Sequence, residues 1–174
     1  METGTPGIAR VAIIMGSDSD WPVMEVCHRQ LCEFGIRSRV EIMSAHRTPE
    51  RVHEFSRRAE ADGIRVIIAA AGMAAALPGS IAAGTTLPVI GVPLESGALM
   101  GIDSLLSMVQ MPPGVPVATV AIGAAGARNA AVLAAQVLAL NDPDLNDALK
   151  NFKRKQAESV DNKNQALRER LASV

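Results

Sequence analysis

Five short apolar runs, each separated from the next by a stretch of helical spacing, constrain the fold of this 174-residue chain more than any other feature. The first run, Val11 to Met15, is wholly apolar and closes at Gly16, as expected for a strand buried on both faces of a sheet. Strands that alternate with helices form a parallel sheet covered on both sides. We therefore predict a three-layer, doubly wound α/β fold with strands at 11–15, 38–43, 65–70, 89–92 and 117–122.

The segments between these strands carry the usual signals of helix starts and ends. Pro22 suits the first turn of a helix that Ser19 or Asp20 can cap, and Gly35 can end it. In the second helix Thr48 is expected as the cap, with Pro49 at the first position. Further helices are predicted up to about residue 83, at 103–111 and at 129–140.

The last part of the chain differs in composition from the rest. It is charged, and Leu145, Leu149, Phe152 and Val160 fall roughly on one helical face. We therefore divide the chain into a domain, 1–142, and a C-terminal helical tail, 143–174. The tail is expected to pack on the domain or on a neighbouring subunit, and a solvated tail is the alternative.

Composition narrows the class of function. The net charge is -1 and aromatic residues make up only 2%, so the chain lacks the basic surface and stacking side chains that nucleic acid or an anionic membrane requires. Residues 66–94 carry no charge, yet seven Gly and Pro residues divide them into pieces too short to span a membrane. The first ten residues hold no apolar stretch typical of a secretory signal. We expect a soluble, cytoplasmic protein, with Cys27 and Cys32 as buried thiols rather than metal ligands or a disulfide.

Ligands of open parallel sheets bind outside the carboxyl ends of the strands, where three loops here have unusual compositions. The first loop, GSDSD, offers Ser17 and Ser19 as hydroxyl and N–H donors at a helix N-terminus, a pattern that suits a phosphate. Asp20 could accept hydrogen bonds from a ribose diol. Ordinary helix capping explains the same residues equally well.

The second loop, SAHR, indicates chemistry more sharply. Arg47 can pair with a phosphate as a planar fork, and His46 can give and take a proton near neutral pH. Ser44 lies beside them in the sequence. His28 and His53 fall in charged helical segments and are expected on the surface.

The third loop, around residues 69–76, offers backbone amides and close approach rather than side chains, which suits a flat ring or a carboxylate. Tight packing of a helix on a strand explains it as well. The chain has no metal-ligand spacing, and neither GxGxxG nor a P-loop follows the first strand. The residues alone thus predict an enzyme that holds a small phosphorylated substrate beside His46, without a metal, dinucleotide or ATP.

Four stretches resemble one known family, the class I 5-(carboxyamino)imidazole ribonucleotide mutases of purine biosynthesis. They are MGSDSDWPVM, SAHRTPE, LPVIGVP and DSLLSMVQMPPGVPVATVAIGAAGARNAA, and the resemblance covers roughly residues 11–140. It implies a flavodoxin-like subunit, a homo-octamer, no cofactor, and movement of a carboxylate from an exocyclic nitrogen to a ring carbon of the ribonucleotide, through decarboxylation and recapture. It also implies that Ser17, Ser19 and Arg47 hold the phosphate with Ser44 nearby, that Asp20 holds the ribose, and that His46 is the general acid and base. The remaining substrate-binding positions implied are Ala71, Gly72, Met73, Ala76 and Leu77.

The third loop departs from the family pattern, which reads AGGAAHLPG where this chain has AAGMAAALPG. Met73 replaces a glycine, so its side chain should exclude a positive φ or fill space meant for the ligand. Ala76 replaces a histidine. Three hypotheses stay open: the mutase, a paralogue that carboxylates or decarboxylates a related aminoimidazole ribonucleotide, and a non-catalytic nucleotide-binding member.

Overall fold

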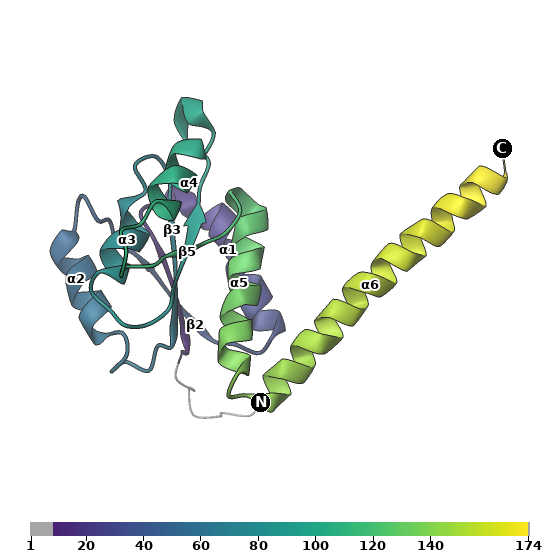
Figure 1. Cartoon of the computed structure of the whole chain (residues 1–174), viewed down its shortest axis with the longest axis horizontal. Helices are drawn as coiled ribbons and strands as arrows, with labels where there is room; N and C mark the ends of the chain where they lie inside the picture. The colour runs from purple at the N-terminus through teal and green to yellow at the C-terminus, as the bar shows by residue number, and fades with distance from the viewer. Residues whose placement is uncertain (1–8, 174) are drawn as a thin grey trace.

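A computed structural model of the chain, described here for residues 9–173, has a five-stranded parallel sheet in the order β2-β1-β3-β4-β5 (Figure 1). The strands are β1 (Val11–Met15), β2 (Ser38–Ile42), β3 (Val66–Ala71), β4 (Val89–Pro93) and β5 (Ala118–Thr119). This confirms the doubly wound α/β fold predicted from the apolar runs. Residues 1–8 and 174 lie outside the described range. They include most of the segment considered for a secretory signal, the start of the predicted domain and the last residue of the predicted tail.

Helices cover both faces of the sheet. One face carries α1 (Trp21–Glu33) and α5 (Gly123–Ala139), and the other carries α2 (Pro49–Arg58), α3 (Ala76–Ala82) and α4 (Ile102–Val109) (Figure 1). Successive side chains of a strand point to opposite faces. Ile13 accordingly packs in the cluster under α1 and α5, and Ile14 in the cluster under α2 and α3. The uninterrupted apolar strands therefore serve two cores at once.

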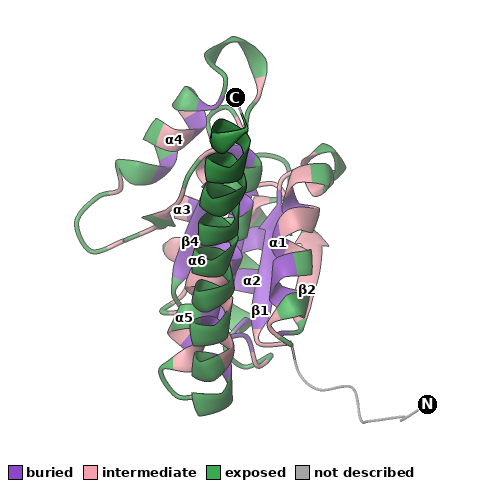
Figure 2. Ribbon diagram, turned by 90° about the vertical axis from the view of Figure 1, so that its right-hand side faces the viewer, coloured by how far each residue is buried: buried purple, intermediate pink, exposed green. Residues whose placement is uncertain are grey.

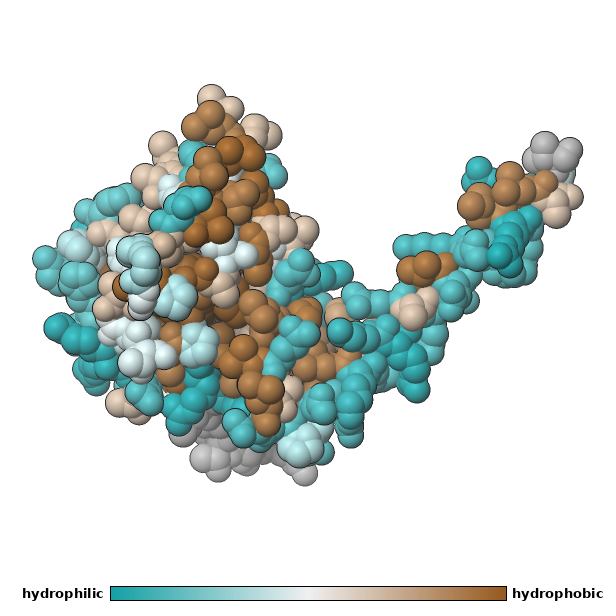
Figure 3. Space-filling model, viewed as in Figure 1, coloured by the Kyte–Doolittle hydropathy of each residue, from teal (hydrophilic) through white to brown (hydrophobic). Residues whose placement is uncertain are grey.

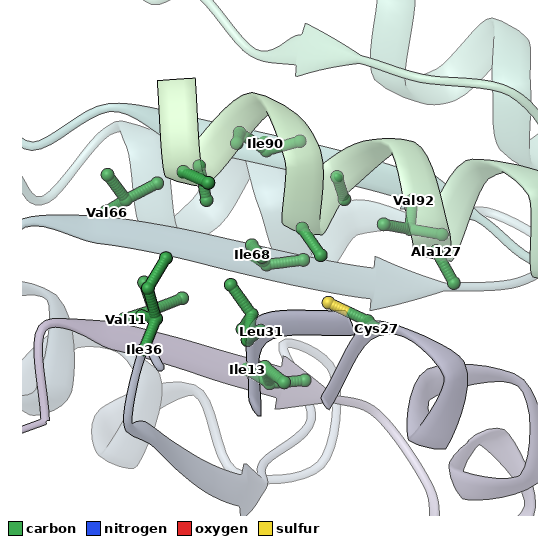
Figure 4. Packing of buried hydrophobic residues seen from close by; sticks show 14 of the residues in the cluster. Val11, Ile13, Cys27, Leu31, Ile36, Val66, Ile68, Ile90, Val92 and Ala127 are labelled. Carbon is green, nitrogen blue, oxygen red and sulfur yellow. The ribbon is translucent and has the colours of Figure 1, made fainter. Parts of the chain in front are cut away.

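The cluster under α1 and α5 is made of aliphatic side chains with almost no accessible surface (Figure 4). Ile13, Leu31 and Ile68 are each 0% exposed. Burying a side chain of this size contributes roughly 1.5–3 kcal/mol. In Figure 2 the central strands are buried along their length, whereas most of α6 (Pro143–Ala172) is exposed.

Two boundaries differ from those predicted. Strand β5 pairs with β4 over Ala118 and Thr119 only, so it is shorter than the predicted 117–122. It is the edge strand of the sheet, and Pro116, which has no N–H to donate, lies two residues before it. Helix α5 begins at Gly123 rather than Asn129. Its first turn is rich in glycine, which lowers helix propensity, but Gly126 is buried so closely that an added Cβ would lie 1.6 Å from the Ala121 carbonyl oxygen. Gly123, Gly126 and Ala127 are also buried in the domain, and this packing extends the helix through residues that look like a loop.

The expectation of two buried thiols is half right. Cys27 is 0% exposed, and burial raises its pKa to about 12, so it stays a neutral thiol. Cys32 is exposed and lies 3.7 Å from Nε2 of His28. Five residues turn an α-helix by about 500°, so Cys32 lies about 140° around α1 from Cys27 and faces solvent. His28 is half-buried and contacts Ser38 at 2.8 Å, which corrects its expected surface position, whereas His53 is exposed.

Helix α6 is one continuous helix that leaves the domain (Figure 1). Asp142 caps it by accepting a hydrogen bond from the Leu145 N–H at 3.2 Å. Leu145 and Leu149 are buried against the domain, and the Phe152 ring lies edge-on to Phe34 with 5.2 Å between centroids. Beyond Phe152 every described residue of the helix is exposed.

Candidate active site

One cavity lies at the carboxyl edge of the sheet, where the loops after β1, β2 and β3 meet. The parallel register aligns Met15 with Ile42 and Ala70, so these three strands end side by side. The cavity has a volume of about 490 Å³. All eleven site residues predicted from the sequence line it: Ser17, Ser19, Asp20, Ser44, His46, Arg47, Ala71, Gly72, Met73, Ala76 and Leu77.

The first loop forms a single turn, η1 (Asp18–Asp20), stabilised by its own side chains. The Ser17 hydroxyl oxygen accepts a hydrogen bond from the Ser19 N–H at 3.3 Å, and the Asp20 carboxylate accepts one from the Ser17 N–H at 3.0 Å. Asp20, one of the two residues predicted as the cap, occupies the N-cap position of α1, but its side chain makes no capping hydrogen bond there. Ser17 is the cap of η1. The Ser19 hydroxyl donates to the Ser17 hydroxyl oxygen at 2.8 Å, and the Ser17 hydroxyl donates to the Asp18 carboxylate at 3.1 Å. Ser17 and Ser19 both line the cavity, and their hydroxyls are linked by this chain of hydrogen bonds.

Asp20 is half-buried beneath this turn. Burial raises the pKa of its carboxyl above the ordinary value, although hydrogen bonds from the Ser17 and Gly16 backbone oppose the shift. The charge of Asp18 adds to the rise and that of Arg47 counters it. The carboxylate thus already accepts hydrogen bonds from the loop, while its place in the cavity wall keeps it available to a ligand hydroxyl.

The second loop is held by Thr48. Its hydroxyl oxygen accepts the Ser44 N–H at 2.9 Å and donates to the Ser44 carbonyl at 3.1 Å. Thr48 occupies the N-cap position of α2 as predicted, but its side chain makes no capping hydrogen bond there. The Ser44 hydroxyl in turn accepts the Arg47 N–H at 3.3 Å. These contacts present His46 and Arg47, both exposed, along one side of the cavity.

The two polar side chains of this loop are held differently. The Arg47 guanidinium donates to the Gly16 carbonyl at 2.8 Å, which ties the second loop to the first. Within residues 9–173, no hydrogen bond fixes the His46 ring. The imidazole is therefore free to meet a ligand in the cavity, whereas the arginine is already oriented.

The third loop is built from unusual backbone conformations. Met73 and Ala75 adopt φ values of 55° and 40°, in the left-handed region that side chains disfavour. Of the two effects expected of a side chain at position 73, exclusion of a positive φ is therefore wrong. Occupation of space meant for the ligand stays a prediction, and Met73 lines the cavity. The Met73 N–H donates to the Ser96 hydroxyl oxygen at 3.0 Å, and the Met73 side chain is 65% exposed.

Sequence reasoning missed part of the cavity wall, namely Gly16, Ala45, Ala74, Ala75 and Ser96. Four of these lie within the loops already singled out. Ser96 follows β4, and the rule that ligands gather beyond strand carboxyl ends applies to that strand as well. Applying the rule to the fourth strand would have found it.

The described chain, residues 9–173, has no group of three or more His, Cys, Asp or Glu side chains that could hold a metal ion. In the same range, no helix is both long enough and apolar enough to cross a membrane.

Fold and site together define an α/β protein with one polar cavity at the carboxyl edge of a parallel sheet. The chain belongs to the AIR carboxylase family, which matches residues 10–159. The family resemblance noted in the four sequence stretches is thereby confirmed.

Similar proteins include two curated mutases and a solved structure. The chain is 56% identical over 147 residues to the N5-carboxyaminoimidazole ribonucleotide mutase of Pyrococcus abyssi, with 84% of this chain and 83% of that protein covered. It is 53% identical over 152 residues to the enzyme of the same name from Escherichia coli K12, with 87% and 90% covered. The crystal structure of Treponema denticola PurE superposes with a TM-score of 0.82 at 32% identity, with 90% of this chain and 97% of that chain covered.

Proposed function

We propose that this protein is an N5-carboxyaminoimidazole ribonucleotide mutase, an isomerase of purine biosynthesis that moves a carboxylate from the exocyclic nitrogen to a ring carbon. Relatives of that name at 53% and 56% identity support the proposal. The single observation that carries it is the cavity that brings His46 and Arg47 together with Ser17 and a loop of small residues.

In this reading the phosphate binds between the first two loops. Ser17 and Ser19 supply hydroxyl donors, and Arg47 supplies a charged, planar donor that Gly16 already orients. Ser44 positions the Arg47 backbone through its own hydroxyl and lies at the edge of the same subsite. A pre-oriented arginine binds phosphate with less loss of side-chain freedom than a mobile one.

Asp20 accepts hydrogen bonds from the ribose hydroxyls in this arrangement. It lies one turn from the phosphate donors in the same cavity wall. The ribose is thus fixed between the phosphate and the third loop, which leaves the imidazole ring for Ala71, Gly72, Met73, Ala76 and Leu77.

His46 performs both proton transfers. Protonation of the substrate accompanies cleavage of the bond between the exocyclic nitrogen and the carboxyl carbon, and this releases carbon dioxide inside the cavity. The ring carbon attacks the carbon dioxide to form the new carbon–carbon bond. His46 then removes the proton of that ring carbon, which restores both the aromatic ring and the imidazolium.

The small third loop has a separate task in this mechanism. Carbon dioxide has no charge to hold it, so efficient transfer requires that both fragments stay together until recapture. Holding them turns a bimolecular encounter into an effectively unimolecular step. The apolar wall of Ala71, Ala75 and Leu77, all buried, keeps the fragments together.

The proposal is tested by incubating purified protein with N5-carboxyaminoimidazole ribonucleotide and following the carbon-carboxylated product by proton NMR. Rapid conversion that needs no added cofactor is expected. Binding of the nucleotide without conversion would contradict the proposal and favour the alternatives.

A second candidate function rests on the exposed Met73 side chain in the cavity, where the family pattern has glycine, and on Ala76, where it has histidine. A larger side chain and a lost imidazole suit a paralogue that carboxylates or decarboxylates a related aminoimidazole ribonucleotide. Testing such nucleotides in the same assay distinguishes it from the mutase. A non-catalytic nucleotide-binding member would bind them all and convert none.

We also propose a homo-octamer that works in the cytoplasm. Apolar side chains gather around α4 at one end of the molecule (Figure 3). This α4 surface consists of five side chains that are each at least 52% exposed: Leu99, Met100, Ile102, Leu106 and Val109. A buried Asp103 carboxylate oxygen without a hydrogen-bond partner lies on the same helix. An apolar surface of this kind is typical of a protein interface, and light scattering tests the octamer.

The distal half of α6 is proposed to pack on a neighbouring subunit. Val160, Leu167 and Leu171 are 64%, 50% and 67% exposed, and helical spacing puts them on the face that Leu145 and Leu149 bury nearer the domain. Leu167→Glu should reduce the assembly mass measured by light scattering. Gln165→Glu, at an exposed position about 160° around the helix from Leu167, is the control and should leave the mass unchanged.

A further inference from the structure

We propose that Ser96, which follows β4, is a positioning residue that holds the third loop in the shape that lines the cavity. The catalytic consequence of this inference rests on the proposed mutase function, whereas the structural part does not. Ser96 lines the same cavity as His46, although it is 50 positions further along the sequence.

The contact continues the sheet beyond its last paired residues. Strands β3 and β4 pair up to Ala71 and Pro93, and the Leu94 N–H then donates to the Ala71 carbonyl at 3.0 Å. Two residues further along each strand, the Met73 N–H donates to the Ser96 hydroxyl oxygen at 3.0 Å. The Ser96 hydroxyl oxygen thus accepts the hydrogen bond that a backbone carbonyl would accept within the sheet, at the point where the segments after β3 and β4 leave it.

The loop needs this external contact because its own backbone is unfavourable. Met73 at φ 55° and Ala75 at φ 40° occupy the left-handed region, where side chains crowd the following carbonyl. Such conformations persist where the surrounding structure enforces them. The Ala75 N–H donates to the Gly72 carbonyl at 3.1 Å within the loop, so the Ser96 contact connects the loop to the strand beside it.

Ser96 also explains why glycine stands at position 72. A Cβ added to Gly72 would lie 2.6 Å from the Ser96 hydroxyl oxygen and 3.2 Å from its Cβ. Gly72 and Ser96 are therefore packed as a pair, with one hydroxyl occupying the space that a side chain would need.

Loss of the hydroxyl should act on turnover rather than on the phosphate subsite. Ser17, Ser19 and Arg47 belong to the first two loops, and none of them contacts Ser96 through a hydrogen bond within residues 9–173. The third loop forms the wall around the reacting atoms. A displacement there of about 1 Å can lower the rate by roughly 100-fold.

The test compares Ser96→Ala, which removes the acceptor, with Ser96→Thr, which keeps it. Ser96 has an extended backbone, φ -157° and ψ 143°, which suits a β-branched residue. In Ser96→Ala, kcat should fall by about 10- to 100-fold while the calorimetric Kd of the carboxylated product nucleotide changes less than about threefold. Ser96→Thr should restore most of kcat. A parallel loss of kcat and product affinity, together with a lower Tm, would mean a general structural role and would overturn the proposal.

A second measurement does not depend on catalysis. Amide hydrogen exchange at Met73 should be slow in the wild type and in Ser96→Thr, and faster in Ser96→Ala, because the hydroxyl is its acceptor. Unchanged exchange in Ser96→Ala would refute the positioning role whatever the activity. A wild-type protein that binds nucleotide without converting it would contradict the proposed function, and the exchange result would still decide the role of Ser96.

Discussion

The Arg47 guanidinium donates a hydrogen bond to the Gly16 carbonyl oxygen over 2.8 Å, across 31 residues of sequence. This contact joins the loop after β2 to the loop after β1, and Arg47 lines the same cavity as Ser17 and Ser19 of the first loop. The arginine is thereby oriented before any ligand arrives. The proposed phosphate subsite thus draws on two loops that the parallel register of β1 and β2 brings to the same edge.

Arg47→Ala should weaken binding of the ribonucleotide by about 10- to 150-fold, because a hydrogen bond to a charged group contributes about 1.5–3 kcal/mol. The affinity of Arg47→Lys should lie between those of the wild type and Arg47→Ala, since an ammonium keeps the charge but loses the planar fork. Titration calorimetry with the substrate nucleotide measures both. Arg51→Ala is the matched control, because Arg51 forms an ion pair with Glu41 at 3.5 Å and does not line the cavity. Equal effects at the two positions would contradict the assignment of Arg47.

His46→Asn should lower turnover by about 10²- to 10⁴-fold, the usual contribution of a general acid and base. Nucleotide affinity should stay nearly unchanged, since the phosphate subsite does not include the imidazole. His53→Asn removes an exposed histidine of α2 and should have wild-type activity. Substantial turnover in His46→Asn would exclude His46 as the proton carrier.

Exchanging the third loop for the family pattern separates the mutase from the paralogue. Ala76→His combined with Met73→Gly should raise mutase turnover if these positions record divergence from a mutase ancestor. Gly at 73 relieves a left-handed side chain, worth roughly 1–2 kcal/mol, but loses about 0.5–1 kcal/mol through greater freedom of the unfolded chain. The difference is at most about 1.5 kcal/mol in favour of Gly, so Tm should rise by no more than about 6 °C, and activity should report the site. An unchanged or lower rate would count against divergence at this loop.

The strands and the three loops were predictable because both depend on local sequence. The apolar run of β1 can be buried only in a central strand, and glycine and serine at its end indicate a turn beside a helix N-terminus. Burial on both faces then places the loop at the carboxyl edge. The six polar residues predicted from the first two loops therefore lie in one cavity, together with the five third-loop positions that the family resemblance implies.

The remaining features depend on contacts between distant residues. The Met73 N–H donates to the Ser96 hydroxyl across 23 residues of sequence, and the local sequence around neither residue predicts this hydrogen bond. The start of α5 depends on the burial of Gly123, Gly126 and Ala127 in the domain, which outweighs the low helix propensity of glycine. The direction in which α6 leaves the domain likewise depends on the edge-on contact of the Phe152 ring with Phe34. The periodicity of the tail does not specify that contact.

The stability of the junction between domain and tail should depend on pH through Asp142. Its carboxylate pairs with Arg10 at 2.7 Å and caps α6 through the Leu145 N–H, and these hydrogen bonds hold its pKa below the ordinary value of 3.8. A carboxyl whose pKa is lower in the folded state stabilises that state at pH values above 3.8, and the contribution is lost as the pH falls through the folded pKa. Asp142→Asn keeps a good capping residue but removes the charge.

Asp142→Asn should therefore lower Tm by about 1–3 °C at pH 7, and the difference from the wild type should shrink as the pH falls from 3.8 toward the lower pKa of the folded state. Thermal unfolding followed by circular dichroism between pH 3 and pH 7 measures this. Asp144→Asn removes an exposed carboxylate from the same first turn without touching Arg10, so its difference from the wild type should depend less on pH. A difference for Asp142→Asn that stays constant over the whole range would show that the charge on Asp142 does not stabilise the junction.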